Sequence, residues 1–405
     1  MADLWTLDDL GRETLRGKRV FVRVDFNVPL SGDGKVLDGT RLEEAVPTIR
    51  ELIGAGAIVV LASHLGRPKG KPDPRYTLRP VAAALASLLG QEVRFAPDCV
   101  GEEVEARVGD LRPGGVILLE NLRFHAGEEK NDPDFAGRLA ALAEVYVDDA
   151  FGSAHRAHAS VVGVPERLAA KAAGRLLARE VVALGRLLGE PERPFAAILG
   201  GAKIEGKIDT LENLLPRLDL LLLGGGMANT FLAAEGHELG GSLFEPDRLD
   251  VARDILARAK ARGTEVLLPH DVVVTDDLGN PTRIETVSAD RIPAGLKAVD
   301  VGPETRKAFA AAIGRARTLF WNGPLGVFEK PPFDAGTREV AAALAGCAGF
   351  TVIGGGETVA AVKQAGVAGR IGHVSTGGGA SLEFLAGRIL PGVAVLEKTG
   401  SEAGR

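Results

Sequence analysis

The stretch "FAAILGGAK" at residues 195–203 joins a run of five apolar residues to a turn that contains two glycines and a lysine. A short apolar run followed by a glycine turn is typical of a strand that leads into a helix. The same arrangement recurs in "LDLLLLGGGM" (218–227) and "FTVIGGGE" (350–357). Longer segments with helical spacing of Ala and Leu separate such runs. This alternation predicts parallel α/β sheets with helices on both faces.

The apolar runs end differently in the two halves of the chain. Those of the first half end in basic or polar side chains, whereas most of those in the second half end in glycine. Ligands of open parallel sheets bind at the carboxyl ends of the strands, where these residues meet. We therefore expect side chains to bind the ligand of the first half and backbone to cradle that of the second. The runs are 19–27, 57–67, 115–124 and 144–156, followed by 195–203, 218–227, 265–274, 318–323 and 350–357.

The segment 174–194 separates the two halves. Its Leu and Val residues recur at roughly helical intervals before a break that contains proline, which predicts an interdomain helix at 175–190. We expect a first domain over 1–174 and a second over 191–390. The predicted fold is α/β, with two Rossmann-like domains, each a parallel sheet flanked by helices, joined by a hinge helix.

Composition restricts the classes of protein that need to be considered. The 405 residues, 45% hydrophobic and 25% charged, are typical of a globular chain with roughly two to three domains. The net charge of -6 argues against a nucleic-acid-binding surface. The N-terminal stretch "MADLWTLDDL" lacks a signal pattern, and the apolar runs are too short to span a bilayer. We expect a cytoplasmic protein with no membrane partner.

Metal-binding and disulfide patterns are weak in this sequence. The two cysteines, Cys99 and Cys347, are far apart, so neither a disulfide framework nor a zinc site is indicated. His155 and His158 have the spacing of a helical chelating pair, but no third ligand stands at a convincing distance. Anion binding or hydrogen bonding in the core is the favoured interpretation for these two histidines.

Basic residues gather at or just after the predicted strand ends of the first half. Arginine suits phosphate because its planar fork donates paired hydrogen bonds and stays protonated near neutrality. A single arginine is more often a solvated surface charge, but several at equivalent strand ends favour a site for a compact polyanion. Asp25 and Asn27 either accept hydrogen bonds from substrate hydroxyls or form the turn before Pro29. The basic residues are Arg41, His64, Arg67, Arg123, His155, Arg156 and His158.

Glycine clusters mark the second half at 200–203, 224–226, 354–356 and 375–383. Glycine lets backbone approach a flat ring or phosphates without a Cβ in the way. Together with Lys203 and Lys207, these clusters favour a nucleotide site. A Rossmann dinucleotide site is discounted, because no G-x-G-x-x-G stands between a strand and a helix with an acidic residue about twenty positions on.

The stretch "GGAKIEGKID" (200–209) is close to a P-loop, but Ile208 stands where a magnesium-binding hydroxyl belongs. A P-loop ATPase requires Ser or Thr after Lys207, so Ile208 argues against that function. Mg²⁺ prefers carboxylates plus substrate phosphates, and Glu357 after the third glycine cluster is the best-placed carboxylate. Spacing alone leaves open whether Glu357 binds the metal or complements a helix dipole.

Nine motifs occur in the order in which one enzyme family has them: "VRVDFNVP", "SHLGRP", "LENLRF", "DAFGSAHRAHAS", "GGAKIEGKI", "GGGMANTFL", "WNGPLGVFE", "GGGET" and "STGGGASLE". Through them the sequence resembles the phosphoglycerate kinase family along essentially its whole length. The resemblance implies reversible phosphoryl transfer between 1,3-bisphosphoglycerate and MgADP, giving 3-phosphoglycerate and MgATP. It further implies a monomer with two hinged domains that close over the substrates, and a segment 391–405 that returns to the first domain.

The resemblance also implies roles for residues that match the family's motifs. Phosphoglycerate would be bound by Asp25, Phe26, Asn27, Arg41, His64, Leu65, Gly66, Arg67, Arg123 and Arg156. The nucleotide would be bound by Lys203, Lys207, Gly225, Asn322, Glu329, Gly355, Gly356, Glu357 and Thr358, with Glu357 also holding Mg²⁺. The catalytic residues would be Arg41, Lys203, Lys207, Gly378 and Gly379.

Two positions depart from the family's pattern. Glu357 stands where the family loop usually has Asp, and Asn229 stands where the family commonly has an apolar residue. A rival hypothesis is a non-catalytic sensor of phosphorylated metabolites, which would bind the acid without needing both Lys203 and Lys207. Nucleotide binding by the second half separates this hypothesis from a kinase.

Overall fold

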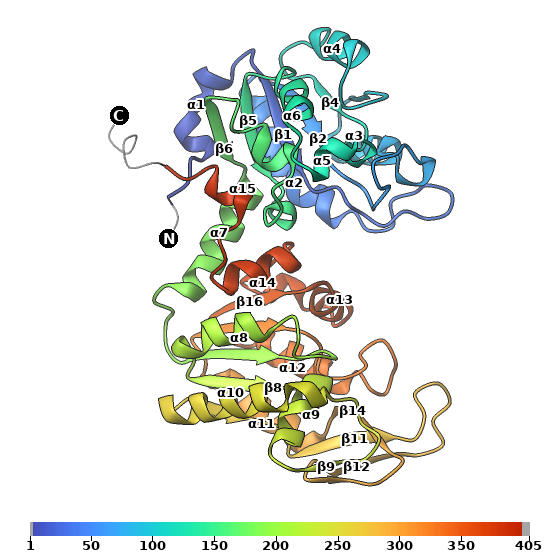
Figure 1. Ribbon diagram of the computed structural model, residues 1–405, viewed down its shortest axis with the longest axis vertical. Coiled ribbons are helices and arrows are strands. Elements are labelled where there is room, and N and C mark those ends of the chain that lie inside the picture. The colour runs from blue at the N-terminus through green and yellow to red at the C-terminus, as the bar shows by residue number, and fades with distance from the viewer. Residues whose placement is uncertain (1–2, 399–405) are drawn as a thin grey trace. The chain divides into compact units, whose positions relative to one another are not determined.

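The computed structural model describes residues 3–398, which form two compact units. The first unit contains residues 3–182 and 389–398, and the second contains residues 183–388. Each unit is built on a parallel sheet of six strands with helices packed around it, which confirms the predicted α/β fold (Figure 1). Within the described part of the chain, no helix has both the length and the apolar character needed to cross a bilayer.

The sheet of the first unit has the strand order β3-β4-β2-β1-β5-β6, and all its strands are parallel. Strand β1 is buried from Val20 to Val24, as expected for a parallel sheet whose two faces are both covered. Arg23 interrupts this apolar run and is also fully buried. The strands are β1 (Arg19–Val24), β2 (Ile58–Ala62), β3 (Val93–Phe95), β4 (Val116–Leu118), β5 (Val145–Asp149) and β6 (Ala170–Ala173).

Helices of the first unit begin and end at residues suited to those positions. At the start of α6, Asp132 accepts a hydrogen bond from Phe135 N at 2.9 Å and Pro133 is the first helical residue. Helix α3 ends at Gly90, whose φ of 73° is the left-handed conformation that glycine tolerates. The α-helices are α1 (Leu7–Leu15), α2 (Thr40–Gly54), α3 (Arg79–Leu89), α4 (Glu102–Gly109), α5 (Ala126–Glu129), α6 (Pro133–Ala140) and α15 (Pro391–Ala394). Shorter turns are η1 (Pro74–Tyr76), η2 (Leu122–Phe124), η3 (Phe151–Ser153) and η4 (Ala159–Gly163).

Helix α7 (Arg175–Leu188) carries the chain from the first unit to the second, and the boundary falls between residues 182 and 183. The chain re-enters the first unit at residue 389. There, Gly392 N donates to Ala154 O at 2.9 Å, and Glu397 pairs with Leu4 in an antiparallel bridge. The part of the predicted C-terminal segment from residue 399 onward lies outside the described residues.

The second unit has the strand order β10-β8-β7-β15-β16-β17 in its large sheet, which is parallel throughout. Its strands are β7 (Phe195–Leu199), β8 (Leu220–Leu223), β10 (Glu265–Leu267), β15 (Thr318–Asn322), β16 (Phe350–Gly354) and β17 (His373–Val374). The helices are α8 (Ile208–Leu214), α9 (Gly225–Ala234), α10 (Leu249–Arg262), α11 (Pro303–Arg315), α12 (Ala335–Ala345), α13 (Gly356–Gln364) and α14 (Gly379–Leu385), with turns η5 (Leu215–Arg217), η6 (Pro246–Arg248) and η7 (Ala368–Arg370).

Two small sheets in the second unit were not predicted. One is antiparallel with the order β12-β11-β14, and the other pairs β13 with β9. The expectation of a single strand within 265–274 was wrong, because this run contributes β10 to the large sheet and β11 to the antiparallel one. Pro269 stands between them and has no N–H with which to continue a ladder. The strands are β9 (Glu238–Leu239), β11 (Asp271–Thr275), β12 (Ile284–Ser288), β13 (Arg291–Ile292) and β14 (Lys297–Val301).

Candidate active site

The first unit carries its candidate site at the carboxyl ends of neighbouring strands. Residues 25–27 follow β1, residues 64–67 follow β2, residues 121–123 follow β4, and residues 153–156 follow β5. Because the strands are parallel and adjacent in the sheet, these segments meet at one edge. The structure therefore brings together most of the polar residues that the sequence predicts for the first ligand.

Asp25 forms an ion pair with Arg41, which lies in the first turn of α2. Burial alone would raise the pKa of the Asp25 carboxyl, but the charges of Arg41 and Arg23 outweigh it and lower that pKa to about 2. Asp25 is thus ionised at neutral pH and can only accept hydrogen bonds. Its Oδ1 also accepts from Asn27 N at 3.2 Å, so the turn predicted before Pro29 is present.

The sequence analysis did not identify Arg23 as a site residue, but its side chain lies at the centre of this cluster. Its Nε donates to Ser160 Oγ at 2.9 Å, and its Nη2 lies 3.2 Å from Nδ1 of His64. Arginine can only donate, so Nδ1 of His64 accepts and the imidazole proton resides on Nε2. Burial and the neighbouring arginines lower the pKa of His64 well below its usual value, so the ring is neutral near pH 7.

The loop after β2 is held by two neighbouring segments. Gly66 N donates to Asn27 Oδ1 at 2.9 Å, and Arg123 Nη1 donates to Gly66 O at 2.7 Å. Leu65 O accepts from Asn121 Nδ2 at 2.7 Å. The side chains of Leu65 and Phe26 belong to the hydrophobic core, so these two predicted residues offer a ligand only their backbone.

The cluster carries more positive charge than its own carboxylates balance. Burial and the adjacent Arg156 lower the pKa of Arg123 to about 10, which still leaves it protonated. Burial and the charges of Arg23, Arg123 and Arg156 lower the pKa of His158 to about 3. Arg67 is exposed, and nothing in residues 3–398 forms an ion pair or hydrogen bond with its guanidinium. Such an arrangement suits a compact polyanion.

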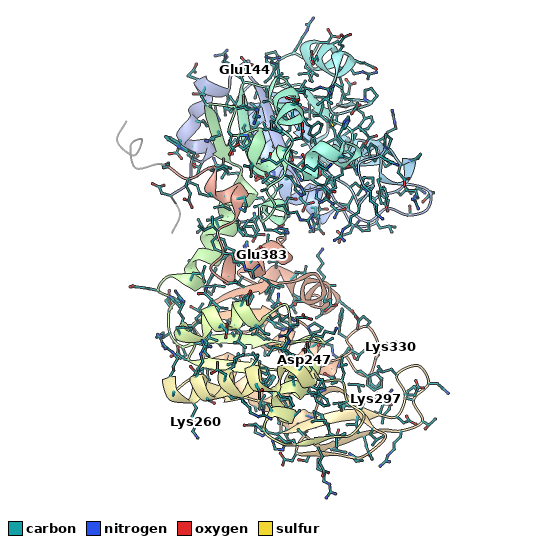
Figure 2. The ribbon with its side chains drawn as sticks, viewed as in Figure 1. Glu144, Asp247, Lys260, Lys297, Lys330 and Glu383 are labelled. Atoms are coloured by element: carbon teal, nitrogen blue, oxygen red, sulfur yellow. The ribbon has the colours of Figure 1, made fainter. Side chains whose placement is uncertain are left out.

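The second unit contains a cavity of about 530 Å³, a volume in the range of small-molecule and cofactor sites. Backbone from the turns after β7, β8 and β15 forms one wall, and residues of the small antiparallel sheet form another. Glu329, Glu357 and Lys297 place charged groups on its lining, and Lys297 is labelled in Figure 2. Lys297 was not predicted, because it belongs to β14 rather than to a strand of the large sheet.

Two glycine turns of the cavity wall approach each other through their backbones. A Cβ on Gly225 would lie 2.7 Å from Gly201 O, and its φ of 63° is left-handed. A Cβ on Gly226 would lie 2.7 Å from Ala202 O. Glycine is therefore required here for the two turns to meet, and side chains are kept out of the space beside them.

The two predicted lysines have different surroundings. Nζ of Lys207 donates to Gly200 O, and burial lowers the pKa of this ammonium while the charge of Glu357 opposes that shift. Lys203 is exposed, and within the described chain its ammonium has no partner. Glu357 lies in the first turn of α13, exposed on the cavity lining. Lys207 and Glu357 therefore lie near each other, whereas Lys203 is exposed on the loop before α8.

Asn322 ends β15 and is 2% exposed. Among residues 3–398 its Nδ2 has no hydrogen-bond partner, which is uncommon for a buried amide. A Cβ on Gly355 would lie 2.9 Å from this nitrogen, so the glycine turn leaves room beside it. Thr358 is buried and accepts a hydrogen bond from Gly323 N at 2.6 Å, which ties α13 to the turn after β15.

Asn229 lines the cavity and is held by the opposite loop. Its Nδ2 donates to Leu243 O at 2.9 Å, and the side chain is almost fully buried. The amide of Asn229 thus has a structural role, because it fixes the loop that carries Leu243. Gly378 and Gly379 stand at the start of α14, which packs on α8 through a hydrogen bond from Thr210 Oγ1 to Leu382 O at 2.9 Å.

A basic cluster in one α/β unit and a glycine-lined cavity with lysine and carboxylate groups in the other are the parts that phosphoryl transfer uses. The family model described as phosphoglycerate kinase matches residues 7–388. The chain belongs to the phosphoglycerate kinase family, and it is an enzyme, a phosphotransferase with a carboxyl group as acceptor.

Individual relatives agree with this family assignment. A phosphoglycerate kinase of Desulforudis audaxviator is 57% identical over 383 residues, covering 95% of this chain and 97% of that protein. One of Thermus thermophilus is 58% identical over 384 residues, covering 94% and 97%. The solved structure of phosphoglycerate kinase from Coxiella burnetii matches with a TM-score of 0.88 at 40% identity, covering 97% of this chain and 98% of that one.

Proposed function

We propose that this enzyme catalyses the reversible transfer of a phosphoryl group from 1,3-bisphosphoglycerate to ADP, giving 3-phosphoglycerate and ATP, as a step of glycolysis and gluconeogenesis. Towards ATP, an oxygen of the ADP β-phosphate bonds to the phosphorus of the acyl phosphate, and the bond from that phosphorus to the carboxyl oxygen breaks. The observation that carries the proposal is the basic cluster in one unit and the glycine-lined cavity in the other, in a member of this family. A cytoplasmic location and a monomeric state stay predictions from the sequence.

We assign the phosphoglycerate to the basic cluster of the first unit. Arg123 and Arg156 supply positive charge close to His64, whose Nε2–H is a neutral donor. Asp25 is ionised and would accept a hydrogen bond from the substrate hydroxyl. Arg67 lies on the neighbouring loop, has no ion-pair or hydrogen-bond partner for its guanidinium among residues 3–398, and would bind an outer phosphate.

We assign the nucleotide and its Mg²⁺ to the cavity of the second unit. The glycine turns would admit phosphates to backbone N–H groups. Nδ2 of Asn322, which has no hydrogen-bond partner in the described part of the chain, would donate to the nucleotide. Glu329 on the lining would accept from the ribose. Glu357 is an exposed carboxylate on the lining, close enough to Lys207 to influence its pKa, and would hold Mg²⁺ together with the phosphates. Bound there, Mg²⁺ would neutralise phosphate charge.

Transfer between the two substrates needs positioning and charge stabilisation rather than a covalent enzyme intermediate. Arg41 and Lys203 would meet the transferring phosphoryl group, and Lys207 would bind the nucleotide phosphates. The backbone N–H groups at Gly378 and Gly379 would face the developing charge. No protein group needs to attack phosphorus. The basic cluster can therefore bind and orient the substrate with a neutral His64 and without an activated nucleophile.

The two binding sites belong to different units, so we propose that the units close about α7 during turnover. Closure would also exclude water and so prevent hydrolysis of ATP. Small-angle scattering should show a smaller radius of gyration with both substrates than with neither. An unchanged radius would argue against closure.

A coupled assay with 3-phosphoglycerate, ATP and Mg²⁺ tests the assignment through Glu357. We expect turnover in the wild type and in Glu357→Asp, and loss of turnover in Glu357→Ala. Glu304→Ala is the matched control, because Glu304 is also an exposed carboxylate at the second position of a helix, α11. Normal turnover in Glu357→Ala would show that another group binds the metal. Absence of turnover in a folded wild type that binds 3-phosphoglycerate but not ATP would favour the sensor hypothesis.

A further inference from the structure

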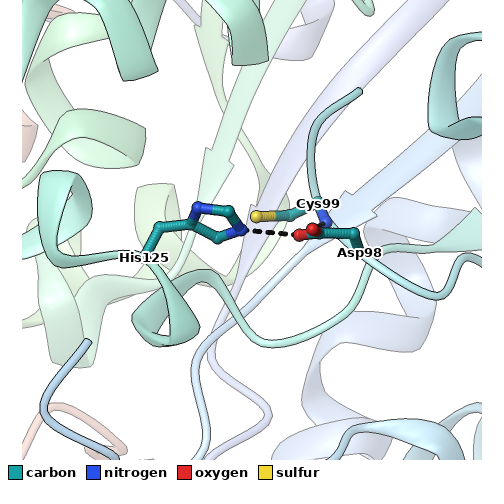
Figure 3. A group of neighbouring side chains, drawn as sticks. All are labelled: Asp98, Cys99 and His125. Carbon is teal, nitrogen blue, oxygen red and sulfur yellow. Dashed lines mark hydrogen bonds and ion pairs between the residues drawn. The ribbon is translucent and has the colours of Figure 1, made fainter. Parts of the chain in front are cut away.

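Asp98, Cys99 and His125 come together in the first unit (Figure 3), and none of them is among the residues assigned to either substrate. One potential ligand atom from each residue lies within 4.8 Å of the others. In the described part of the chain, this is the one group of three His, Cys, Asp or Glu side chains with such spacing. The residues come from two loops, one between β3 and α4 and the other between η2 and α5.

The carboxylate of Asp98 lies at the centre of the group. Nε2 of His125 is 2.6 Å from Asp98 Oδ1, and Cys99 N donates to the same oxygen at 2.6 Å. The ring of His125 stacks on Phe135, with centroids 5.1 Å apart and an interplanar angle of 21°. This stacking holds the imidazole with Nε2 directed toward the carboxylate (Figure 3).

The three side chains differ in burial in a way that suits an ion entering from solvent. Cys99 is fully buried, whereas the side chains of Asp98 and His125 are 47% and 31% exposed. The thiol therefore forms the floor and the two polar groups form the rim. Burial and the adjacent Asp98 raise the pKa of the Cys99 thiol, so without a metal it stays protonated and unreactive.

We propose that Asp98, Cys99 and His125 form a binding site for one Zn²⁺ ion, with water as the fourth ligand. Thiolate, imidazole and carboxylate are the ligand types that zinc takes, at about 2.0–2.3 Å. At those lengths the ligand atoms of a tetrahedral site stand roughly 3.3–3.8 Å apart. The 2.6 Å distance between His125 Nε2 and Asp98 Oδ1 must therefore increase when zinc binds, and the half-exposed Asp98 side chain has room to move. Zinc would bind the thiolate of Cys99 and Nε2 of His125, so binding releases the thiol proton.

This inference does not depend on the proposed kinase activity. His125 stands two residues after Arg123, in the loop that follows η2. A bound ion would connect that loop to the one that carries Asp98, so we expect zinc to raise the thermal midpoint of the protein. The spacing in the sequence gives no sign of the site, because twenty-five residues separate Cys99 from His125 and only one cysteine takes part.

Cobalt titration of the full-length, chelator-treated protein tests the site without nucleotide present. Co²⁺ takes the same ligands as Zn²⁺, and a bound thiolate gives an absorption band from thiolate-to-cobalt charge transfer. We expect one equivalent of Co²⁺ to produce this band and Zn²⁺ to abolish it by displacement. A wild type that shows no band with Co²⁺ and retains no zinc after gel filtration would overturn the proposal.

Variants assign the band to the three residues. Asp98→Asn and His125→Gln should each weaken Co²⁺ binding at least tenfold, and Cys99→Ala should remove the band. Cys347→Ala is the matched control, because Cys347 is the other thiol of the chain, and the band should persist in it. Circular dichroism checks folding, and the two rim variants keep the test valid if the buried Cys99→Ala does not fold. A band that persists in Asp98→Asn and His125→Gln, or disappears in Cys347→Ala, would place the cobalt elsewhere.

Discussion

Nη2 of Arg23 lies 3.2 Å from Nδ1 of His64, so a fully buried arginine determines which imidazole nitrogen carries the proton. We predict that Arg23→Met raises the KM for 3-phosphoglycerate at least tenfold, because His64 loses the contact that orients it. The variant should also lose about 1–3 kcal/mol of unfolding free energy, because the buried acceptors Ser160 Oγ and Val24 O lose the donors that Arg23 supplies. Kinetics and urea unfolding measure the two effects.

The control for Arg23 lies on the same strand. Arg19 is half-exposed and pairs with Glu144 at 3.5 Å, so Arg19→Met should cost no more than about 1 kcal/mol and leave KM unchanged. Equal effects of the two substitutions would contradict the role assigned to Arg23.

Arg41 is expected to contribute to the transition state. Arg41→Ala should lower kcat on the order of a thousandfold, the range for arginines that stabilise a transferring phosphoryl group. The pKa of Asp25 should also rise from about 2, because its partner charge is gone, and carboxyl NMR can follow this. Arg50→Ala on the same helix is the control, since the Arg50 guanidinium donates only to Leu88 O, at 2.9 Å, within the described residues. A loss in kcat of less than tenfold would exclude this role for Arg41.

Gly225 tests the close approach of the two glycine turns. Gly225→Ala should weaken ADP binding at least tenfold in calorimetry, because its Cβ would lie 2.7 Å from Gly201 O and displace the cavity wall. Gly236→Ala is matched in backbone, with φ of 92°, but its Cβ would meet no atom within 4 Å. It should cost only about 1–2 kcal/mol of stability from the backbone conformation. Similar ADP affinities in both variants would show that the contact does not shape the site.

Asn229 is expected to position the loop that carries Leu243. Asn229→Leu should cost about 1 kcal/mol and weaken ADP binding, because the 2.9 Å hydrogen bond to Leu243 O is lost. Asn213→Leu removes a similar bond, from Nδ2 to Leu385 O at 2.7 Å, in the same unit but away from the cavity lining. Fluorescence-detected unfolding should give similar losses for both, and only Asn229→Leu should change the Kd for ADP. An unchanged Kd for ADP in Asn229→Leu would show that Asn229 contributes to stability but not to nucleotide binding.

The ionisation of Asp300 is expected to make the free energy of unfolding depend on pH. Burial raises the pKa of this carboxyl to about 7, against backbone hydrogen bonds from Gly336 and Val301 and the charge of Arg306, which lower it. The folded state therefore keeps the proton at pH values where the unfolded chain has lost it. The contribution of Asp300 to stability is full below about pH 4 and declines as pH rises to about 7, by up to about 4 kcal/mol.

Asp300→Asn cannot ionise and should flatten this part of the profile. In urea unfolding, the stability of the variant relative to wild type should improve between pH 5 and pH 8. Asp250→Asn, at an exposed position of α10, controls for the loss of a charge. Parallel profiles for wild type and Asp300→Asn would show that Asp300 does not titrate in this range.

Four strands of the first large sheet and five of the second were predictable, because these strands are apolar and end in turns that the sequence displays. The run at 19–27 shows this for β1, and the glycines after 195–199 and 220–223 show it for β7 and β8. The short edge strands β3, β6 and β17 were missed, because runs of two to four residues give no distinct pattern. The roles assigned to the site residues stay predictions until the variants are measured.

Features that depend on contacts distant in sequence could not be predicted. Arg23 occupies a core position of β1, where burial on both faces of the sheet favours an apolar residue, and the basic residue inside "RVFVRV" was the one available signal. Lys297 and the split at Pro269 required knowledge of which strands pair in the small sheet. The group of Asp98, Cys99 and His125 depends on two loops meeting, which no local pattern encodes.

The first unit is completed by the last described residues of the chain, where Trp5 N donates to Leu396 O at 2.9 Å and Lys398 Nζ lies 3.0 Å from Asp9 Oδ1. The second unit is one continuous segment, residues 183–388. On the ribosome, the second unit is therefore complete before residues 389–398 emerge, and it is free to fold while the first still lacks part of its structure. The unit that begins translation first can therefore be completed only after the whole of the other unit has been made.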